Sequence, residues 1–295
     1  MWQQQLNEIK QGNRKTLARC ISLVENEVAG YEELLEQLPF SNIPVIGITG
    51  PPGAGKSTLV DALTALLVAA DKKVGVLCVD PSSPFNLGAL LGDRIRMSEW
   101  YNNPNVFIRS LATRGSLGGL HPKIIEISDL LKVAAFDYII VETVGVGQSE
   151  IEIAGLADVT VVVAVPEAGD EVQTMKAGLM EIADIFVVNK ADRPDADLFV
   201  KNLRLMLAPA FSNHTIPVQV VKTVAAQKKG IQELLEAIQN IKLQSLNSKR
   251  NWLLAEKAFQ LIEQKRMKGI SKEELKNKIN GEGKAFNLYR FIKNY

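Results

Sequence analysis

Short apolar runs alternate with amphipathic stretches from Val45 to about Ile241. The runs are apolar at consecutive positions, as in VTVVVAV at residues 159–165, which is typical of strands buried on both faces of a sheet. Because stretches with helical pattern or length separate most of them, we expect an α/β fold with a mostly parallel sheet flanked by helices. The predicted strands are Val45–Gly50, Val74–Val79, Val106–Arg109, Tyr138–Glu142, Val159–Val165, Ile185–Val188 and Val218–Val221.

Helices are predicted on either side of this region. Residues 1–38 are expected to be helical and to end at Pro39, because apolar residues recur there at the spacing of one helix face: Leu17, Ile21, Val24 and Val28. Residues 245–295 have the pattern of two or three helices and hold 12 Lys and Arg against 5 Asp and Glu. This basic tail is either a partner-binding arm or, in the interpretation we favour, a solvated helical face packed on a neighbour.

Composition narrows the class of protein. A net charge of +1 and 46% hydrophobic residues indicate a globular protein without an electrostatic bias towards nucleic acid or membrane, and we expect neither as a partner. Two cysteines, Cys20 and Cys78, are too few for a disulfide framework or a thiolate metal site and are expected to be reduced and buried. Without an apolar N-terminal segment or a run of 18 apolar residues, the chain is expected to be cytoplasmic.

A phosphate-binding motif directly follows the first predicted strand. The segment GPPGAGKS fits G-x-x-x-x-G-K-[ST], in which glycines let backbone N–H groups surround phosphate oxygens. Lys56 is expected to reach the β- and γ-phosphates, the Ser57 hydroxyl to coordinate Mg²⁺, and the helix N-terminus to add its dipole. This predicts a nucleoside triphosphate site with Mg²⁺. Its candidate binding residues are Gly50, Pro51, Pro52, Gly53, Ala54, Gly55, Lys56, Ser57 and Thr58.

A second motif, NKAD at residues 189–192, indicates that the base is guanine. A carboxylate can accept hydrogen bonds from the N1–H and N2–H₂ groups of guanine, and adenine offers no such pair of donors. We expect Asp192 to read the base, Asn189 to brace the loop and the Lys190 stem to cover the base. The alternative is a surface turn in which Asp192 caps a helix. The loop KTVAA is expected to touch guanine O6 through Thr223, Val224 and Ala225, although it matches the usual T/S-x-A poorly.

Carboxylates at two predicted strand ends could hold the metal. Asp80 and Glu142 each end a strand beside the phosphate loop, where they can bind Mg²⁺ directly or through water. Glu142-x-x-Gly145 has the form of a switch in which the Gly145 N–H contacts the γ-phosphate. Asp93, in LLGDRIRM, is either a further metal ligand on a mobile loop or a helix cap. Gln148 is a candidate for orienting the attacking water.

Taken together, the motifs are similar to those of one family. The segments GITGPPGAGKST, DPSSPF, LGDRIRM, RSLATRGSLGGL, VETVGVGQSE, AGDEVQTMKAGLMEIAD and NKAD occur in the order found in the MeaB/ArgK-type GTPases, bacterial relatives of the human protein deficient in cblA methylmalonic aciduria. The resemblance covers roughly residues 10–245. Three parts depart from the family: Leu87-Gly88-Ala89 stands where Gly-Gly-Ser is usual, KTVAA is an atypical base-contact loop, and the short tail from about Leu246 does not resemble the usual C-terminal arm.

The resemblance implies a homodimeric P-loop GTPase of the SIMIBI class that binds GTP and GDP. It implies a metallochaperone-like protein that binds adenosylcobalamin-dependent methylmalonyl-CoA mutase, or a related acyl-CoA mutase, gates its cofactor loading and protects it. Hydrolysis would depend on Lys56, Asp80, Asp93 and Glu142, and a further switch at Asp170–Lys176 would let Lys176 complete the site when the partner is bound. The implied organisation is a helical extension over 1–42, the GTPase domain over 43–242 and a helical tail over 243–295 that could serve as a dimerisation arm.

Two other function classes remain open at this point. A kinase would transfer the phosphate to a substrate, and the expected recognition of guanine by Asp192 argues against this class. A metal-insertion GTPase would carry histidine or cysteine clusters, whereas this chain has only His121 and His214, far apart, which we expect to be structural or surface residues. Intrinsic hydrolysis is expected to be slow. Arg114, the one candidate for an arginine finger in cis, is interpreted instead as fixing its loop by pairing with a carboxylate.

Overall fold

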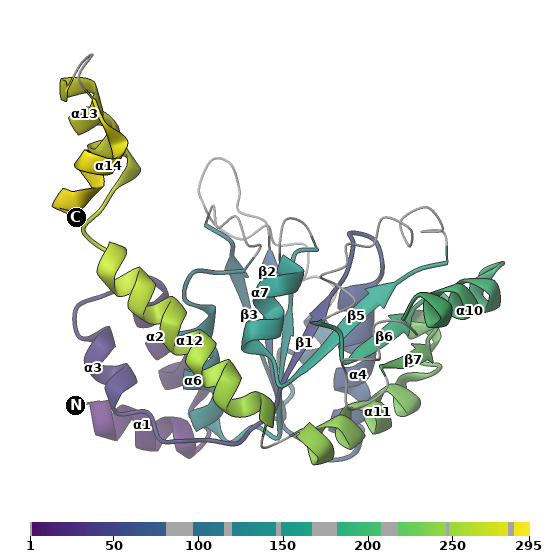
Figure 1. Ribbon diagram of the computed structural model, residues 1–295. Coiled ribbons are helices and arrows are strands. Elements are labelled where there is room, and N and C mark those ends of the chain that lie inside the picture. The colour runs from purple at the N-terminus through teal and green to yellow at the C-terminus, as the bar shows by residue number, and fades with distance from the viewer. Residues whose placement is uncertain are drawn as a thin grey trace. The chain divides into compact units, whose positions relative to one another are not determined.

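The computed structural model describes residues 2–80, 97–114, 120–145, 149–166, 182–207, 218–245, 248–282 and 286–295. The strands in these ranges form one sheet in the order β3-β2-β4-β1-β5-β6-β7, and every pairing is parallel (Figure 1). The strands are β1 (Val45–Thr49), β2 (Val74–Asp80), β3 (Val106–Ala112), β4 (Tyr138–Glu142), β5 (Val159–Ala164), β6 (Ile185–Val188) and β7 (Gln219–Lys222). The predicted α/β fold with a parallel sheet is confirmed.

The strands in the middle of the sheet are buried at every position, as their uninterrupted apolar runs predict. The edge strands β3 and β7 also contain half-exposed positions. Strand β3 continues past its predicted end at Arg109 to Ala112, because its backbone stays paired with β2 as far as Asp80. Ser110, Leu111 and Ala112 therefore belong to the sheet rather than to a loop.

Helices cover both faces of the sheet and extend beyond it. Up to Arg250 the chain forms one compact unit. Its helices are α1 (Trp2–Lys10), α2 (Arg14–Glu25), α3 (Tyr31–Glu36), α4 (Lys56–Ala69), η1 (Ser98–Trp100), α6 (Ile124–Leu131), η2 (Lys132–Ala134), α7 (Ser149–Leu156), α10 (Ala196–Leu207), η4 (Ala225–Gln227), α11 (Ile231–Ser245) and the start of α12 (Ser248–Met267). Among all residues that the structure describes, every helix is too short or too polar to span a lipid bilayer.

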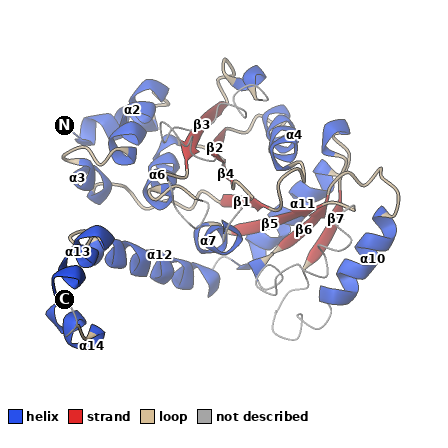
Figure 2. Cartoon of the chain, turned by 90° about the horizontal axis from the view of Figure 1, so that it is seen from above, coloured by secondary structure: helices blue, strands red, loops and turns tan. Residues whose placement is uncertain are grey.

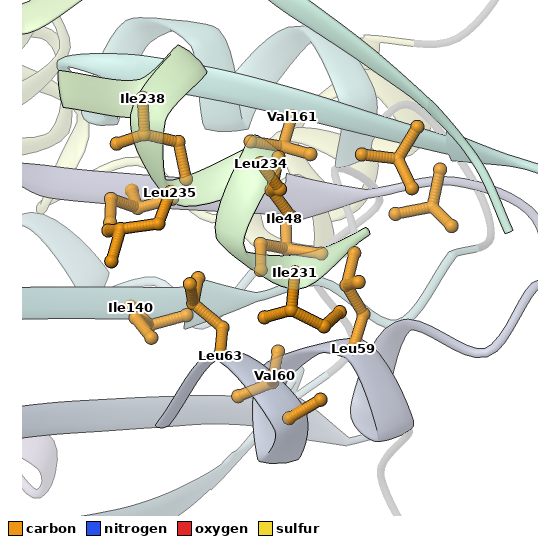
Figure 3. Close-up of a cluster of buried hydrophobic side chains, with 14 of the residues drawn as sticks. Ile48, Leu59, Val60, Leu63, Ile140, Val161, Ile231, Leu234, Leu235 and Ile238 are labelled. Carbon is orange, nitrogen blue, oxygen red and sulfur yellow. The ribbon is translucent and has the colours of Figure 1, made fainter. Parts of the chain in front are cut away.

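The main hydrophobic core lies between α4, α11 and one face of the sheet. Leu59 and Leu63 from α4 meet Leu234 and Ile238 from α11 over the central strands, all of them buried (Figure 3). On the other face, α7 packs tightly on β1 at Gly47, where a Cβ atom would lie 2.5 Å from Ile153 Cγ1. Because α4 is held along its length by this core, the position of its first turn, which carries Lys56, is fixed.

The N-terminal segment is helical, as predicted, but it is broken into three helices. Helix α2 ends at Glu25, Glu27 adopts a left-handed backbone conformation with φ of 48°, and Val28 is 44% exposed. The predicted helix face from Leu17 to Val28 is therefore wrong at its last position. The Asn26 side chain donates to the carbonyl of Ser22 and closes the helix before that position is reached.

The second compact unit, Asn251–Tyr295, holds most of α12 together with α13 (Lys272–Glu282), α14 (Leu288–Phe291) and η6 (Ile292–Asn294). Phe291 is buried in this unit, and its ring lies 5.6 Å from that of Phe286 and 5.5 Å from that of the exposed Tyr295. Several apolar side chains of this unit are exposed: Phe259, Ile262, Met267, Leu288, Tyr289 and Ile292. In the first unit, Cys20 and Cys78 are both buried and form no disulfide, as predicted.

Candidate nucleotide-binding site

The phosphate-loop motif forms the connection between β1 and α4 at the carboxyl edge of the sheet. Gly50, Gly53 and Gly55 have backbone φ values of 142°, 76° and 88°, which residues other than glycine rarely adopt. A Cβ atom on Gly50 would lie 2.2 Å from the Val163 carbonyl oxygen, and one on Gly55 would lie 2.4 Å from Asn189 Nδ2. The glycines therefore serve both the turn of the loop and its close packing against β5 and the loop after β6.

Lys56 begins α4, and its ammonium group lies inside the loop. The side chain is 6% exposed, and Nζ donates to the Gly50 and Pro51 carbonyl oxygens at 2.9 and 3.1 Å. Gly145, the predicted switch glycine after β4, is packed against the same group, because a Cβ atom there would lie 2.4 Å from Lys56 Nζ. The structure thus brings Lys56 and the Gly145 backbone together, as a shared contact with one phosphate group would require.

The predicted metal-binding residues of the described ranges lie at the carboxyl ends of the neighbouring strands β2 and β4 and in the first turn of α4. Asp80 at the end of β2 is 6% exposed and Glu142 at the end of β4 is 4% exposed. The Ser57 hydroxyl donates to Glu142 Oε1 at 2.7 Å. The hydroxyl groups of Thr49, at the end of β1, and Thr143, directly after β4, lie 2.9 Å apart and are buried, and no sequence motif marks either residue. Carboxylate and hydroxyl oxygens are the donors that Mg²⁺ prefers, so this set of side chains fits that ion.

Asn189 connects three loops that are far apart in the sequence. Its Nδ2 donates to the Ala54 carbonyl oxygen of the phosphate loop at 2.9 Å. Its Oδ1 accepts from the Thr223 hydroxyl and from the Ala225 backbone N–H, both at 3.1 Å. The side chain is 3% exposed, so these bonds form in a setting where an unpaired amide is costly. The KTVAA loop is therefore fixed to the phosphate loop despite its poor match to the usual pattern.

The residue predicted to read the base lies on the surface of the same group of loops. Asp192 is exposed, and the backbone on either side of it is fixed, since Ala191 N–H donates to Thr223 O and Arg193 N–H to Lys190 O, both at 3.0 Å. Lys190 Nζ donates to the Gly53 carbonyl oxygen at 2.8 Å, which ties this loop to the phosphate loop a second time. The Asp192 carboxylate is thus open to solvent on a fixed backbone.

Some predicted site residues lie outside the described ranges. They are Asp93 and Leu87-Gly88-Ala89 in the segment after β2, Gln148 after β4, and Asp170–Lys176 after β5, and His214 before β7 lies outside them too. The site described above therefore consists of the phosphate loop, the ends of β2 and β4, and the loops after β6 and β7.

Arg114 takes the structural role that the sequence analysis favoured. Its guanidinium donates to the Glu25 carboxylate at 3.2 Å, to the Glu25 carbonyl oxygen at 2.9 Å and to Asn26 Oδ1 at 2.9 Å. The same carboxylate accepts from Arg109 at 2.5 Å. No local pattern marks Glu25, because its partners Arg109 and Arg114 lie 84 and 89 positions away in the chain.

His121 lies beside this cluster and provides a test of the fold. It is 2% exposed, and its Nδ1 accepts from the Lys123 backbone N–H at 3.0 Å. Burial lowers its pKa from 6.5 to about 4; Glu25 opposes the shift, and Arg114, Lys123 and Arg109 add to it. The unfolded chain therefore takes up a proton near pH 6.5 that the folded protein takes up only near pH 4.

We expect the free energy of unfolding to fall as the pH is lowered through this window, by at most about 3 kcal/mol in total from this group. Chemical denaturation of the wild type and of His121→Gln between about pH 7 and about pH 5 measures the effect, because the variant has no titrating group at this position. Equal pH slopes for the two proteins would contradict the assignment of a buried neutral imidazole.

Comparison with known proteins agrees with the geometry of the site. The sequence model of the family described as methylmalonyl-CoA mutase-associated GTPase MeaB matches residues 17–283. A Pyrococcus horikoshii protein named as a GTPase is 48% identical over 242 residues, which are 80% of this chain and 76% of the relative. The GTPase ArgK of Escherichia coli is 38% identical over 250 residues, or 80% of this chain and 75% of its own.

A solved structure extends the similarity to the fold. The crystal structure of an LAO/AO transport system kinase superposes with a TM-score of 0.68 at 31% identity, covering 96% of this chain and 87% of that one. The family match and the relatives point to a GTPase, and the solved structure shows the same fold; P-loop GTPases generally use Mg²⁺ with their nucleotide. The chain therefore belongs to the MeaB family of GTPases and hydrolyses GTP.

Proposed function

We propose that this GTPase binds GTP through the site described above. Lys56 holds the β- and γ-phosphates, and the Gly145 N–H contacts the γ-phosphate. Ser57, Asp80 and Glu142, with Asp93 from the segment after β2, hold Mg²⁺, which draws charge from the phosphate oxygens. Support for these roles comes from the burial of Lys56 and both carboxylates and from the 2.7 Å bond that joins Ser57 to Glu142.

The product of hydrolysis, in this proposal, is a change in a protein partner. The partner is an adenosylcobalamin-dependent methylmalonyl-CoA mutase or a related acyl-CoA mutase, whose cofactor loading the GTPase gates. The observation that carries the proposal is the family match over residues 17–283, because the description of that family names the mutase. Lys176, from the segment after β5, is proposed to complete the site when the mutase is bound.

The proposal is tested by mixing the purified chain with methylmalonyl-CoA mutase. We expect co-elution in the presence of GTP analogue or GDP and an increase in phosphate release on the order of 10- to 100-fold, since a partner supplies groups that a slow GTPase lacks. An unrelated protein of similar size is the control. Unchanged phosphate release, together with separate elution in both nucleotide states, would refute the proposed partner.

A second candidate function is phosphoryl transfer to a substrate. It is favoured by one observation, the similarity to a crystal structure described as a transport system kinase. GTP labelled in the γ-phosphate separates the two candidates: a regulatory GTPase releases the label as free phosphate, and a kinase transfers it to an acceptor. We favour the GTPase, because the proposed reading of guanine by Asp192 argues against a kinase, and the described groups close to Lys56 are the loop backbone and the proposed metal ligands.

We also propose that the protein is a homodimer formed through its C-terminal tail. The unit Asn251–Tyr295 exposes apolar side chains on both α12 and α14, such as Phe259, Ile262 and Tyr289. Exposed apolar side chains gathered on one small unit are typical of association surfaces. Light scattering on the preparation used for the mutase experiment reports the dimer as twice the chain mass of 32.4 kDa.

A further inference from the structure

Ion pairs join the N-terminal helices to the edge of the sheet, next to a proposed metal ligand. Glu25, in the last turn of α2, has a side chain that is 13% exposed and binds two guanidinium groups. One belongs to Arg109, within β3, and the other to Arg114, just beyond the end of β3. We call this set of three residues the Glu25 clasp; Figure 2 shows α2 beside β3 and α6.

Strand β3 needs such a contact because it is an edge strand. Among the described residues only β2 pairs with it, and edge strands open more readily at their ends than strands paired on both sides. The last pair of the β2–β3 ladder is Asp80 with Ala112, and Thr113 N–H donates to the Asp80 carbonyl oxygen at 3.1 Å. The residues that the clasp holds therefore flank the backbone that supports Asp80.

We propose that the Glu25 clasp is a positioning device for Asp80, so that the N-terminal helices belong to the metal-binding machinery of the GTPase. Charge-assisted bonds from one carboxylate to both guanidinium groups keep the end of β3 paired with β2. That pairing holds the Asp80 backbone, and a fixed backbone limits the positions open to its buried carboxylate. The inference rests on the proposed role of Asp80 in binding Mg²⁺.

The chain offers a matched control within two positions of Glu25. Glu27 also ties the N-terminal helices to the core, since its carboxylate binds Lys123 Nζ at 2.9 Å. Lys123 directly precedes α6, so the Glu27 ion pair joins the N-terminal segment to the start of that helix rather than to β3. Glu25→Gln and Glu27→Gln therefore each remove one charge and weaken an ion pair between the same two parts of the protein, but only the first disturbs the support of Asp80.

The test measures GTP hydrolysis against Mg²⁺ concentration at a temperature where thermal unfolding shows each variant to be folded. For Glu25→Gln we expect the Mg²⁺ concentration at half-maximal rate to rise about 3- to 10-fold, with binding of GDP in the absence of Mg²⁺ unchanged. Arg114→Lys keeps the charge but loses the planar guanidinium group, and it should also raise the Mg²⁺ concentration at half-maximal rate. Glu27→Gln should leave the Mg²⁺ concentration at half-maximal rate at the wild-type value.

Asp80→Asn separates a failure of this inference from a failure of the proposed function. If Asp80→Asn raises the Mg²⁺ requirement and Glu25→Gln does not, the positioning role is overturned and the metal site stands. If Asp80→Asn has no effect, the proposed metal role of Asp80 is wrong and the inference falls with it. A purely structural clasp would lower the unfolding temperature of Glu25→Gln without moving the Mg²⁺ dependence, and that result also overturns the proposal.

Discussion

Replacement of Lys56 by alanine should reduce GTP hydrolysis on the order of 10²- to 10³-fold or more, as expected when a preorganised charge at the reacting phosphate is removed. Lys56 is 6% exposed and its ammonium group is held only 2.9 and 3.1 Å from two loop carbonyl oxygens. Phosphate oxygens carry negative charge and are stronger acceptors than carbonyl oxygens, so they would take over these bonds. Single-turnover phosphate release and calorimetry with GTP measure the loss of rate and of affinity.

Lys72→Ala is the matched control for this change. Lys72 forms an ion pair with Asp137 at 3.8 Å next to the amino end of β2, and its side chain is 47% exposed. Both variants remove one lysine charge, but Lys72 lies at the opposite edge of the sheet from the phosphate loop. Hydrolysis by Lys72→Ala should equal that of the wild type, and wild-type hydrolysis by Lys56→Ala would show that the phosphate site has been assigned wrongly.

The features of this protein that can be predicted from its sequence are those determined by residues close together in the chain. Continuous apolar runs mark buried parallel strands, so all seven predicted strands are present in the described residues. The phosphate loop is predictable for the same reason, because its glycines and its lysine act within one turn of the chain. Strand order and register follow only from packing, and so does the extension of β3 to Ala112, which depends on pairing with β2.

Contacts between distant segments were not predictable. Asn189 could be assigned a bracing role, but its simultaneous bonds to Ala54, Thr223 and Ala225 depend on how three loops meet at one sheet edge. In the sequence, Glu25 is an acidic residue near a helix end with no distinguishing pattern. Its contacts with Arg109 and Arg114 exist only because the fold places these residues next to it. The exposure of Val28 has a local cause, the closure of α2 at Asn26, which hydrophobic periodicity does not detect.

Asp192→Asn should exchange the base that the protein prefers. Guanine presents two donors, N1–H and N2–H₂, and a carboxylate accepts both, whereas an asparagine accepts one and turns its own donor towards the other. Losing one charge-assisted bond and weakening the second costs about 3–6 kcal/mol, so GTP affinity should fall on the order of 10²- to 10⁴-fold. Xanthine carries N1–H beside a carbonyl oxygen, which matches asparagine, and the affinity for xanthosine triphosphate should rise.

The position of Asp192 allows the effect of this substitution to be interpreted directly. Asp192 is exposed while its neighbours Ala191 and Arg193 are fixed through their backbones, so the substitution changes the carboxylate without disturbing the loop. Asp195→Asn, at another exposed acid of the same segment, removes an equal charge and should leave both affinities unchanged. Calorimetry with GTP, ATP and xanthosine triphosphate decides the matter. If Asp192→Asn binds GTP as tightly as the wild type, the base is not read by this carboxylate, and Asp192 is the surface turn residue of the alternative interpretation.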